Sequence, residues 1–381
     1  MGDKQIGYER QTLPSKRGLS MFEQIYDLES LCAAFKRAQL DNRYKRKICA
    51  FCFSLEENLL RLNWELQRGS YVPSPYTYFM LHDPKIRAIA APDFRDRVVQ
   101  HALVDCIQPI LEKQFIYDSF ACREEKGTHF AARRVKRFLM AARSLYGSQT
   151  PIYVLQCDIR KFFQSVSWDI LLGIVQNTIT CPKTFALIRT IVTTHYNALP
   201  PTKTDSCQMS LFSKSSVGID ASISVATRTG LPIGNLTSQL LANVYLNELD
   251  HFIKDRLRLR WYARYMDDFL VIHPDRVYLK QLCDQINIFL KDTLHLSLHP
   301  KKLTIKNVSD GVPFVGYRIF YDHVLIRGNT LRRIEKNYRS KTKQLKNGRF
   351  TEEKLDQTKA SITGHLKHAN SYGLTKKIFS K

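Results

Sequence analysis

The chain has 381 residues, of which 44% are apolar, including 21 Phe and 18 Tyr. This composition excludes a disordered chain and gives enough apolar surface for two or three packed subdomains. Lys and Arg number 58 against 35 Asp and Glu, a formal charge of +23, so nucleic acid is the expected partner, ahead of anionic lipid.

Targeting signals and a disulfide framework are not expected. No apolar run approaches the roughly 18 residues of a membrane span, and the first residues lack the apolar stretch of a signal peptide. We therefore expect a cytoplasmic protein with no membrane contact. The nine cysteines are single apart from the pair Cys49 and Cys52, which favours reduced thiols, and one CxxC is a weak zinc motif.

The first half of the chain predicts helices around one hairpin. Leucines at helical spacing within residues 20–70 predict an N-terminal helical layer. Pro73 and Pro75 open an extended segment, and the residues from Tyr76 to Ala90 predict a hairpin with cations near its turn. A helix follows Pro92, and then a basic helix that either faces a phosphate backbone or is simply solvated.

Two later segments change composition. Residues 200–229 are rich in Ser and Thr, which predicts a mobile lid, a binding loop or disorder. From Leu331 to Phe350 there are eight Lys or Arg and one acid, Glu335, which predicts a strongly basic helical subdomain.

Three carboxylates are the strongest chemical signal. The apolar strand predicted from Tyr153 ends on Asp158, and residues 261–272 predict a second hairpin with Asp267 and Asp268 at its tip. Carboxylates beside a hydrophobic sheet repel each other and resist desolvation, so they call for cations, and Mg²⁺ prefers oxygen ligands. Two such ions catalyse nucleotidyl transfer. Taken alone, two acids in a turn would be an ordinary solvated pair.

The sequence resembles reverse transcriptases in ordered blocks that cover about residues 70–325. The catalytic blocks are Asp158-Ile159-Arg160-Lys161-Phe162-Phe163, which resembles the first catalytic motif, and Tyr265-Met266-Asp267-Asp268, which resembles the YxDD box. The other blocks are Pro92–Ala102 and Asp118–Thr128 for the fingers, Leu231–Gln239 for the intervening motif and Gly311–Tyr317 for the primer grip.

The resemblance implies an α+β right-hand polymerase that copies RNA into DNA. Its fingers, its palm of antiparallel sheet plus helices and its small helical thumb set the expected boundaries. These are an N-terminal helical extension at 1–70, fingers at 71–150, a palm at 151–325 with a fingers-like insertion at about 197–229, and a basic thumb at 326–381.

The family's metal ligands carry over by position. Asp158 and Asp267 match the ligands, Asp268 completes the acidic cluster, and the carbonyl of Ile159 adds a donor for two Mg²⁺ ions or for Mn²⁺ in their place. Lys302 matches a lysine proposed to protonate the departing pyrophosphate, with Lys301 as its neighbour.

The resemblance also implies a set of residues that contact the incoming dNTP. They are Lys85, Arg87, Ile159, Phe163, Ile233, Gly234 and Gln239. Phe163 falls at the steric gate that excludes a ribose 2′-hydroxyl, whereas Phe162 is expected in the core. Lys85 and Arg87 match the cations that hold the triphosphate.

The intervening motif departs from the common pattern. Many relatives have Gln where this chain has Ile233 and end the motif Ser-Pro, whereas this chain ends it Ser238-Gln239. The variant resembles reverse transcriptases of diversity-generating retroelements, and also some antiviral or uncharacterised bacterial ones. By the first resemblance, Ile233 would loosen contacts to the template base and permit mutagenic copying, especially opposite adenine.

The expected partners are template RNA, a primer, the cDNA product and dNTPs. A small accessory protein, a dedicated noncoding RNA and an oligomer are left open, and so is the choice between diversification and antiviral defence. A catalytically silent RNA-binding scaffold is the rival from another class. An RNA-directed RNA polymerase would need a smaller or polar group at Phe163, and a metal nuclease would need further acids or a catalytic His. His365 and His368 in the tail fit packing or RNA contacts better than metal binding.

Overall fold

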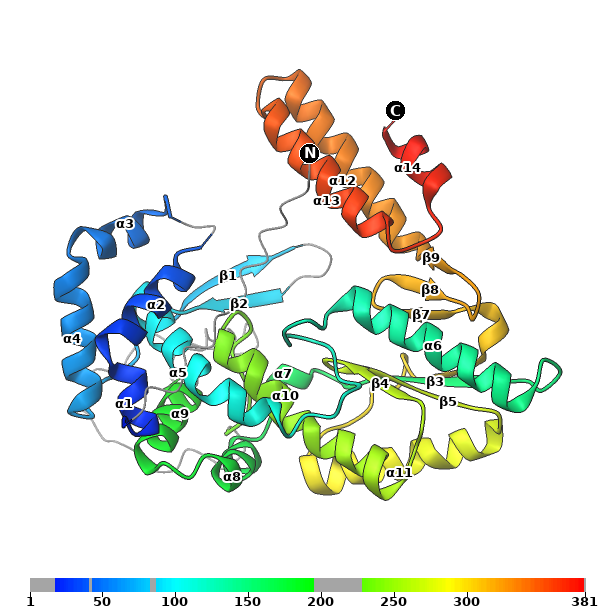
Figure 1. The fold of residues 1–381 in the computed structure, drawn as a ribbon, viewed down its shortest axis with the longest axis horizontal. Coiled ribbons are helices and arrows are strands. Elements are labelled where there is room, and N and C mark those ends of the chain that lie inside the picture. The colour runs from blue at the N-terminus through cyan, green and yellow to red at the C-terminus, as the bar shows by residue number, and fades with distance from the viewer. Residues whose placement is uncertain (1–17, 41–42, 83–86, 195–227, 380–381) are drawn as a thin grey trace, which may run out of the picture. The chain divides into compact units, whose positions relative to one another are not determined.

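The computed structural model describes residues 18–40, 43–82, 87–194 and 228–379. Each of its two compact units combines separate parts of the chain: 1–115 with 161–245, and 116–160 with 246–381. Helices and antiparallel sheets occur together, which confirms the α+β class (Figure 1). The boundaries of fingers, palm and thumb stay a prediction, and most of the polar segment at 200–229 lies outside the described residues.

The first unit begins with the predicted helical layer. Its helices are α1 (Met21–Tyr26), α2 (Leu28–Ala38), α3 (Arg46–Phe53) and α4 (Leu55–Gln67). Ser20 and Glu23 form a capping box at the start of α1, and Asp27 caps α2, so these starts are encoded locally. Helix α2 packs on α5 (Phe94–Glu112) through buried residues that include Leu31 and Ala34.

The same unit contains the predicted hairpin. Strand β1 (Thr77–Leu81) pairs antiparallel with β2 (Arg87–Ala91), which confirms the extended segment. The remaining helices of the unit are α7 (Phe162–Ser165), α8 (Trp168–Thr178), α9 (Pro182–Thr194) and the first part of α10 (Leu236–His251).

The second unit is built on an antiparallel four-stranded sheet in the order β4-β5-β3-β6. The strands are β4 (Tyr262–Tyr265), β5 (Asp268–His273), β3 (Tyr153–Asp158) and β6 (Thr304–Asn307). Helix α6 (Thr128–Tyr146) packs on β4 and β5, and α11 (Arg276–Leu294) packs on β3 and β6. Because side chains alternate along a strand, Val154 joins the core under α6 while its neighbours face the other way.

A second sheet and a helical tail share that core. The sheet has the order β7-β8-β9, with β7 (Val312–Phe314), β8 (Tyr317–Ile319) and β9 (Val324–Ile326). The tail consists of α12 (Gly328–Lys346), α13 (Glu352–Leu366) and α14 (Tyr372–Phe379), as the basic composition predicted. Tyr338, Leu355 and Leu366 of the tail are buried in the same cluster as Phe314 and Tyr317. Among the described helices, none is both long and apolar enough to cross a bilayer.

An ion pair is buried beneath the second hairpin. Arg264 of β4 and Asp250 of α10 are both fully buried, and the guanidinium donates to both carboxylate oxygens at 2.7 and 2.6 Å. The hydroxyl of Tyr262 donates to the same carboxylate at 2.6 Å. Burial is the largest single effect and would lower the pKa of Arg264, but the charge and hydrogen bonds of Asp250, together with Tyr262, outweigh it and raise that pKa. The pair therefore stays ionised.

Breaking this pair should destabilise the second unit. Asp250→Asn leaves the buried Arg264 charge without its counterion, so we expect a loss of about 3 kcal/mol or more in the free energy of unfolding. Urea titration followed by circular dichroism measures it. The matched control is Asp356→Asn, which removes an exposed ion pair with Lys359 and should cost about 0.5 kcal/mol or less. Equal effects of the two substitutions would contradict the prediction.

Candidate active site

The pairing of β3 with β5 brings two of the expected carboxylates together. Asp158 is the last residue of β3 and Asp268 the first of β5, and the two are register partners in the ladder. The strand interior from Val154 to Cys157 is buried, whereas Asp158 at its end is half-buried. The N–H of Ile159 donates to the carbonyl of Asp267 at 3.1 Å, so the third acid joins the same edge. Like charges directly opposite each other on a sheet destabilise it.

The predicted hairpin forms from β4 and β5 with a two-residue turn of Met266 and Asp267, so Asp267 lies at the tip and Asp268 begins the second strand. Met266 has a φ of +56°, in the left-handed region that non-glycine residues rarely adopt. Short hairpin loops use positive φ because it matches the twist of the flanking strands. A guanidinium nitrogen of Arg264 donates to the carbonyl of Met266 at 3.2 Å, so the buried ion pair also holds this turn.

The electrostatics of the cluster centre on Asp268. Burial, and then the charges of Asp158 and Asp267, raise the pKa of Asp268 to about 7, against the opposing effects of Lys302 and Arg327. The neighbouring cations thus leave part of the negative charge uncompensated. Such a shift is typical of functional sites.

A loop after α11 places Lys302 at the cluster. The N–H of His299 donates to the carbonyl of Asp158 at 2.7 Å, and the N–H of Arg160 donates to Ser297 at 2.9 Å. The N–H of Lys302 donates to the carbonyl of His299 at 3.0 Å, and its ammonium group forms an ion pair with the Asp158 carboxylate. Of the two adjacent lysines considered from the sequence, Lys302 therefore contacts a catalytic candidate.

The donor set fits a hard divalent cation. Asp158, Asp267 and Asp268 offer carboxylate oxygens, and Ile159 offers a backbone carbonyl next to them, which are the ligand types of Mg²⁺. Within the described ranges, no group of three His, Cys, Asp or Glu side chains is already arranged around one metal position, and Asp158 is paired with Lys302. Uncompensated charge on Asp268 favours an added cation, which would lower its pKa.

Apart from Ile159, the expected dNTP contacts belong to the first unit. Lys85 lies outside the described residues, and Arg87 is the exposed first residue of β2. Phe162 is buried, which confirms it as a core residue, whereas Phe163 is half-buried. The carbonyl of Phe163 accepts from the N–H of Leu231 at 2.6 Å, so the expected sugar gate is attached to the intervening motif.

The intervening loop is also attached to the β1–β2 hairpin. The N–H of Ala90 donates to the carbonyl of Ile233 at 2.9 Å. At Gly234, φ is +121° and an added Cβ would lie 3.0 Å from the carbonyl oxygen of Ala90, so only glycine fits without strain. Gln239 is half-buried in the first turn of α10. The gate, loop and hairpin thus form one hydrogen-bonded group.

Some supporting residues were not found from the sequence. The amide nitrogen of Asn235 donates to the hydroxyl of Tyr76 at 2.6 Å, and both side chains are buried. Arg264 and Asp250 were also missed. An arginine inside the otherwise apolar run from Trp261 was the available signal, because a buried guanidinium requires a carboxylate partner.

His365 and His368 pack with His129 of α6. The rings of His129 and His368 stack at 3.8 Å, and the hydroxyl of Tyr317 lies 3.3 Å from Nδ1 of His365. Burial, and then the neighbouring histidines, lower the pKa of His129 to about 4. These histidines therefore pack the tail against α6 as uncharged rings.

Known proteins match most of this chain. The family model described as reverse transcriptase (RNA-dependent DNA polymerase) matches residues 82–319. Protein YkfC of Escherichia coli is 27% identical over 290 residues, which cover 67% of this chain and 69% of YkfC. Group II intron-encoded protein LtrA of Lactococcus lactis is 22% identical over 329 residues, which cover 69% of this chain and 50% of LtrA.

One solved structure in the comparison is apo telomerase from Candida tropicalis, with 11% identity, a TM-score of 0.49 and coverage of 85% of this chain and 64% of that one. The family match is the stronger finding, because it spans more than half of the chain and includes Asp158, Asp267 and Asp268. This chain belongs to the reverse transcriptase family of RNA-dependent DNA polymerases.

Proposed function

We propose that this reverse transcriptase extends a DNA strand at a two-cation centre held by Asp158, Asp267 and Asp268. The observation that carries the proposal is the convergence of three carboxylates at one end of β3 and β5, where burial and the charges of Asp158 and Asp267 raise the pKa of Asp268. When bound, the divalent cations would activate the attacking 3′-hydroxyl and offset charge on the leaving pyrophosphate. The backbone carbonyl of Ile159 supplies a further oxygen ligand.

The remaining residues bind the substrates and move a proton. Lys302 donates a proton to the leaving pyrophosphate, a role supported by its contact with Asp158. Lys85 and Arg87 hold the triphosphate by charge-assisted contacts. The ring of Phe163 selects deoxyribose, and the loop of Ile233, Gly234 and Gln239 lies under the nascent base pair. Template RNA, primer and cDNA product are the macromolecular ligands, and Lys and Arg of the tail contact their backbones.

For the biological role, we propose mutagenic copying in a diversity-generating retroelement. Ile233 and the ending Ser238-Gln239 support it, since Ile233 replaces a polar side chain beside the base pair. The main-chain hydrogen bond from Ala90 to Ile233 does not involve the Ile233 side chain, which supports a position where that side chain can differ between relatives. Antiviral synthesis on a dedicated noncoding RNA is the alternative, and an accessory protein or oligomer fits either role.

The catalytic proposal is tested by primer extension on an RNA template with Mg²⁺. Asp267→Asn should lower the rate about a thousandfold or more, because it removes a charge that acts on the transition state. Asp292→Asn, at an exposed site on α11, is the control and should act like the wild type. The wild type should use dNTPs and reject rNTPs. Full activity of Asp267→Asn, or ready use of rNTPs, would overturn the assignment.

The metal site can be tested without an activity assay, by measuring the free energy of unfolding in buffers with and without Mg²⁺. The folded pKa of Asp268 is about 7, while an unfolded Asp ionises near pH 4, so the wild type loses stability as pH rises between these values. Without divalent ions, Asp268→Asn should therefore stabilise the fold more at about pH 8 than at about pH 5. Added Mg²⁺ should stabilise the wild type and have much less effect on the variant. A pH-independent difference would contradict this prediction.

The mutagenic role is tested by sequencing products of Ile233→Gln beside those of the wild type. We expect fewer misincorporations in the variant, above all opposite template adenine, because Gln restores polar contacts at the base pair. The matched control, Ile288→Gln, changes an exposed residue of α11 and should leave the error rate unchanged. Equal error rates in all three proteins would sink the idea, and repetitive products would favour defence.

A further inference from the structure

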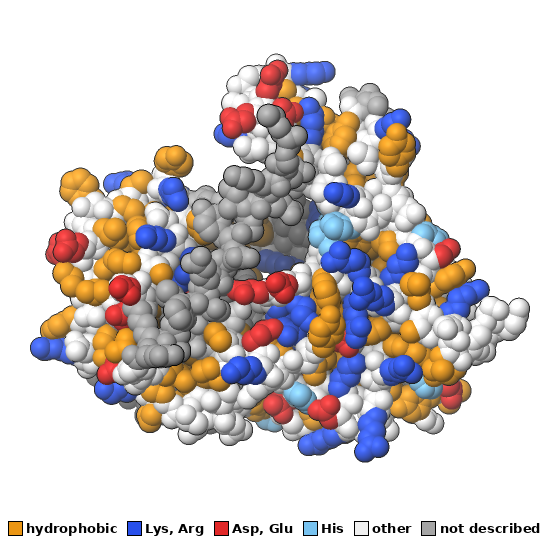
Figure 2. All heavy atoms as spheres, viewed as in Figure 1, with side chains coloured by type: hydrophobic (Ala, Val, Ile, Leu, Met, Phe, Trp, Pro, Cys, Tyr) orange, Lys and Arg blue, Asp and Glu red, His pale blue; other side chains and the backbone are white. Residues whose placement is uncertain are grey.

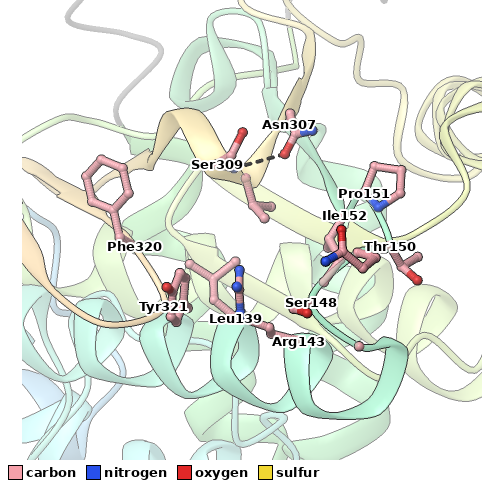
Figure 3. A pocket seen from close by; sticks show the side chains of 13 residues that line it. Leu139, Arg143, Ser148, Thr150, Pro151, Ile152, Asn307, Ser309, Phe320 and Tyr321 are labelled. Carbon is pink, nitrogen blue, oxygen red and sulfur yellow. Dashed lines mark hydrogen bonds between the residues drawn. The ribbon is translucent and has the colours of Figure 1, made fainter.

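A pocket of about 340 Å³ lies at the opposite end of β3 from the catalytic candidates. Its walls come from the end of α6, the loop before β3, the segment that follows β6 and the chain after β8 (Figure 3). Strand β3 rises about 3.3 Å per residue, so about 20 Å separates Ile152 from Asp158. The pocket is thus distinct from the carboxylate cluster. Its volume is at the lower end of the range for small-molecule binding sites.

One wall of the pocket is aromatic and cationic. The guanidinium of Arg143 lies 4.1 Å from the ring centre of Tyr321, whose exposed fraction is 41%. Phe320 stacks on His323 at 4.3 Å with an interplanar angle of 12°. Gly311 lies directly against the ring of Phe320, since an added Cβ there would lie 2.5 Å from that ring. Planar groups of this kind are surfaces on which bases of single-stranded RNA stack.

The facing wall offers polar groups that could form hydrogen bonds with the edge of a base. Asn307 uses its side-chain oxygen to accept from the N–H of Ser309 at 2.9 Å, which leaves its amide nitrogen as the donor toward other partners. Thr150 lies across the pocket from Phe320 in Figure 3, and its hydroxyl donates to the main-chain carbonyl of Tyr146 at 2.6 Å. The buried side chains of Leu139 and Ile152 form an apolar floor.

Helix α6, which ends at this pocket, carries several Lys and Arg side chains. Arg133 and Arg137 are exposed on α6, and Figure 2 shows Lys and Arg side chains gathered over this helix. Lys136 donates to the carbonyl of Asp322 at 2.6 Å and so ties the turn that carries Tyr321 to the helix. Ten residues of helix from Arg133 to Arg143 span about 15 Å, enough for a short stretch of RNA backbone.

We propose that this surface binds single-stranded RNA outside the catalytic centre, with phosphates along α6 and one base stacked on Tyr321 in the pocket. The combination of exposed cations with an aromatic and amide-lined pocket favours RNA over a protein partner, which would need a broader apolar face. The proposal rests on the chain's use of RNA and is independent of the roles given to the carboxylates. It would anchor the template or a dedicated noncoding RNA away from the primer terminus.

The test uses the full chain saturated with an unlabelled, blunt primer–template duplex. A single-stranded RNA carrying 4-thiouridine is then added, crosslinked by light and mapped by mass spectrometry, and its affinity is measured by fluorescence anisotropy. We expect a crosslink at Phe320 or Tyr321. Tyr321→Ala should weaken binding about tenfold, as expected for one lost stacking contact. Tyr321→Phe should bind like the wild type, because it retains the ring.

Arg276→Ala is the matched control, since Arg276 lies over Tyr153 at 6.0 Å and Tyr153 faces away from the α6 side of the sheet. It should leave RNA affinity unchanged, and thermal unfolding should show each variant to be folded. Asp267→Asn should crosslink like the wild type, which separates this proposal from the catalytic one. Crosslinks confined to other peptides, equal affinities of Tyr321→Ala and Arg276→Ala, or capture of a protein by this surface would overturn the proposal.

Discussion

The ion pair between Arg264 and Asp250 is the constraint on which the arrangement of the second unit depends. Moving two charges into a protein interior costs several kcal/mol per ion, and only close, bidentate geometry offsets that cost. The geometry here satisfies this condition and extends to Tyr262 and the carbonyl of Met266. Helix α10, strand β4 and the turn before Asp268 are therefore fixed together, and the turn cannot relax without exposing or orphaning a charge.

The fixed turn before Asp268 also determines the geometry of the carboxylate cluster. Asp158 and Asp268 are register partners on adjacent strands whose interiors are buried and, apart from Gln156, apolar, so their repulsion cannot be relieved by separating the strands. The protein thus keeps unfavourable electrostatic repulsion at the position where we propose that divalent cations bind. Lys302 offsets part of it through Asp158, while burial keeps the pKa of Asp268 high. A fold optimised for stability alone would replace at least one of these acids.

Local pattern was enough to predict the elements that hold the candidate catalytic carboxylates. The apolar run that ends at Asp158 and the hairpin that contains Asp267 both formed as expected, because alternation and turn position are local properties. Arg264 in an apolar run signals a carboxylate partner, but which carboxylate it pairs with, and the contact of Tyr76 with Asn235, depend on tertiary packing and could not be predicted from local pattern. The pocket beside Tyr321 was missed for the same reason: its walls come from four segments that no single motif connects.

The hydrogen bond from Ala90 to Ile233 involves main-chain atoms only. The position of the loop therefore does not depend on which side chain stands at residue 233. Position 233 can exchange its side chain while the loop keeps its anchor to the hairpin. Under the role proposed for Ile233, single substitutions at that position would change copying accuracy without compensating changes in the backbone of the loop. Gly234, whose backbone admits no side chain, offers no such freedom, so neighbouring residues of one loop differ sharply in evolvability.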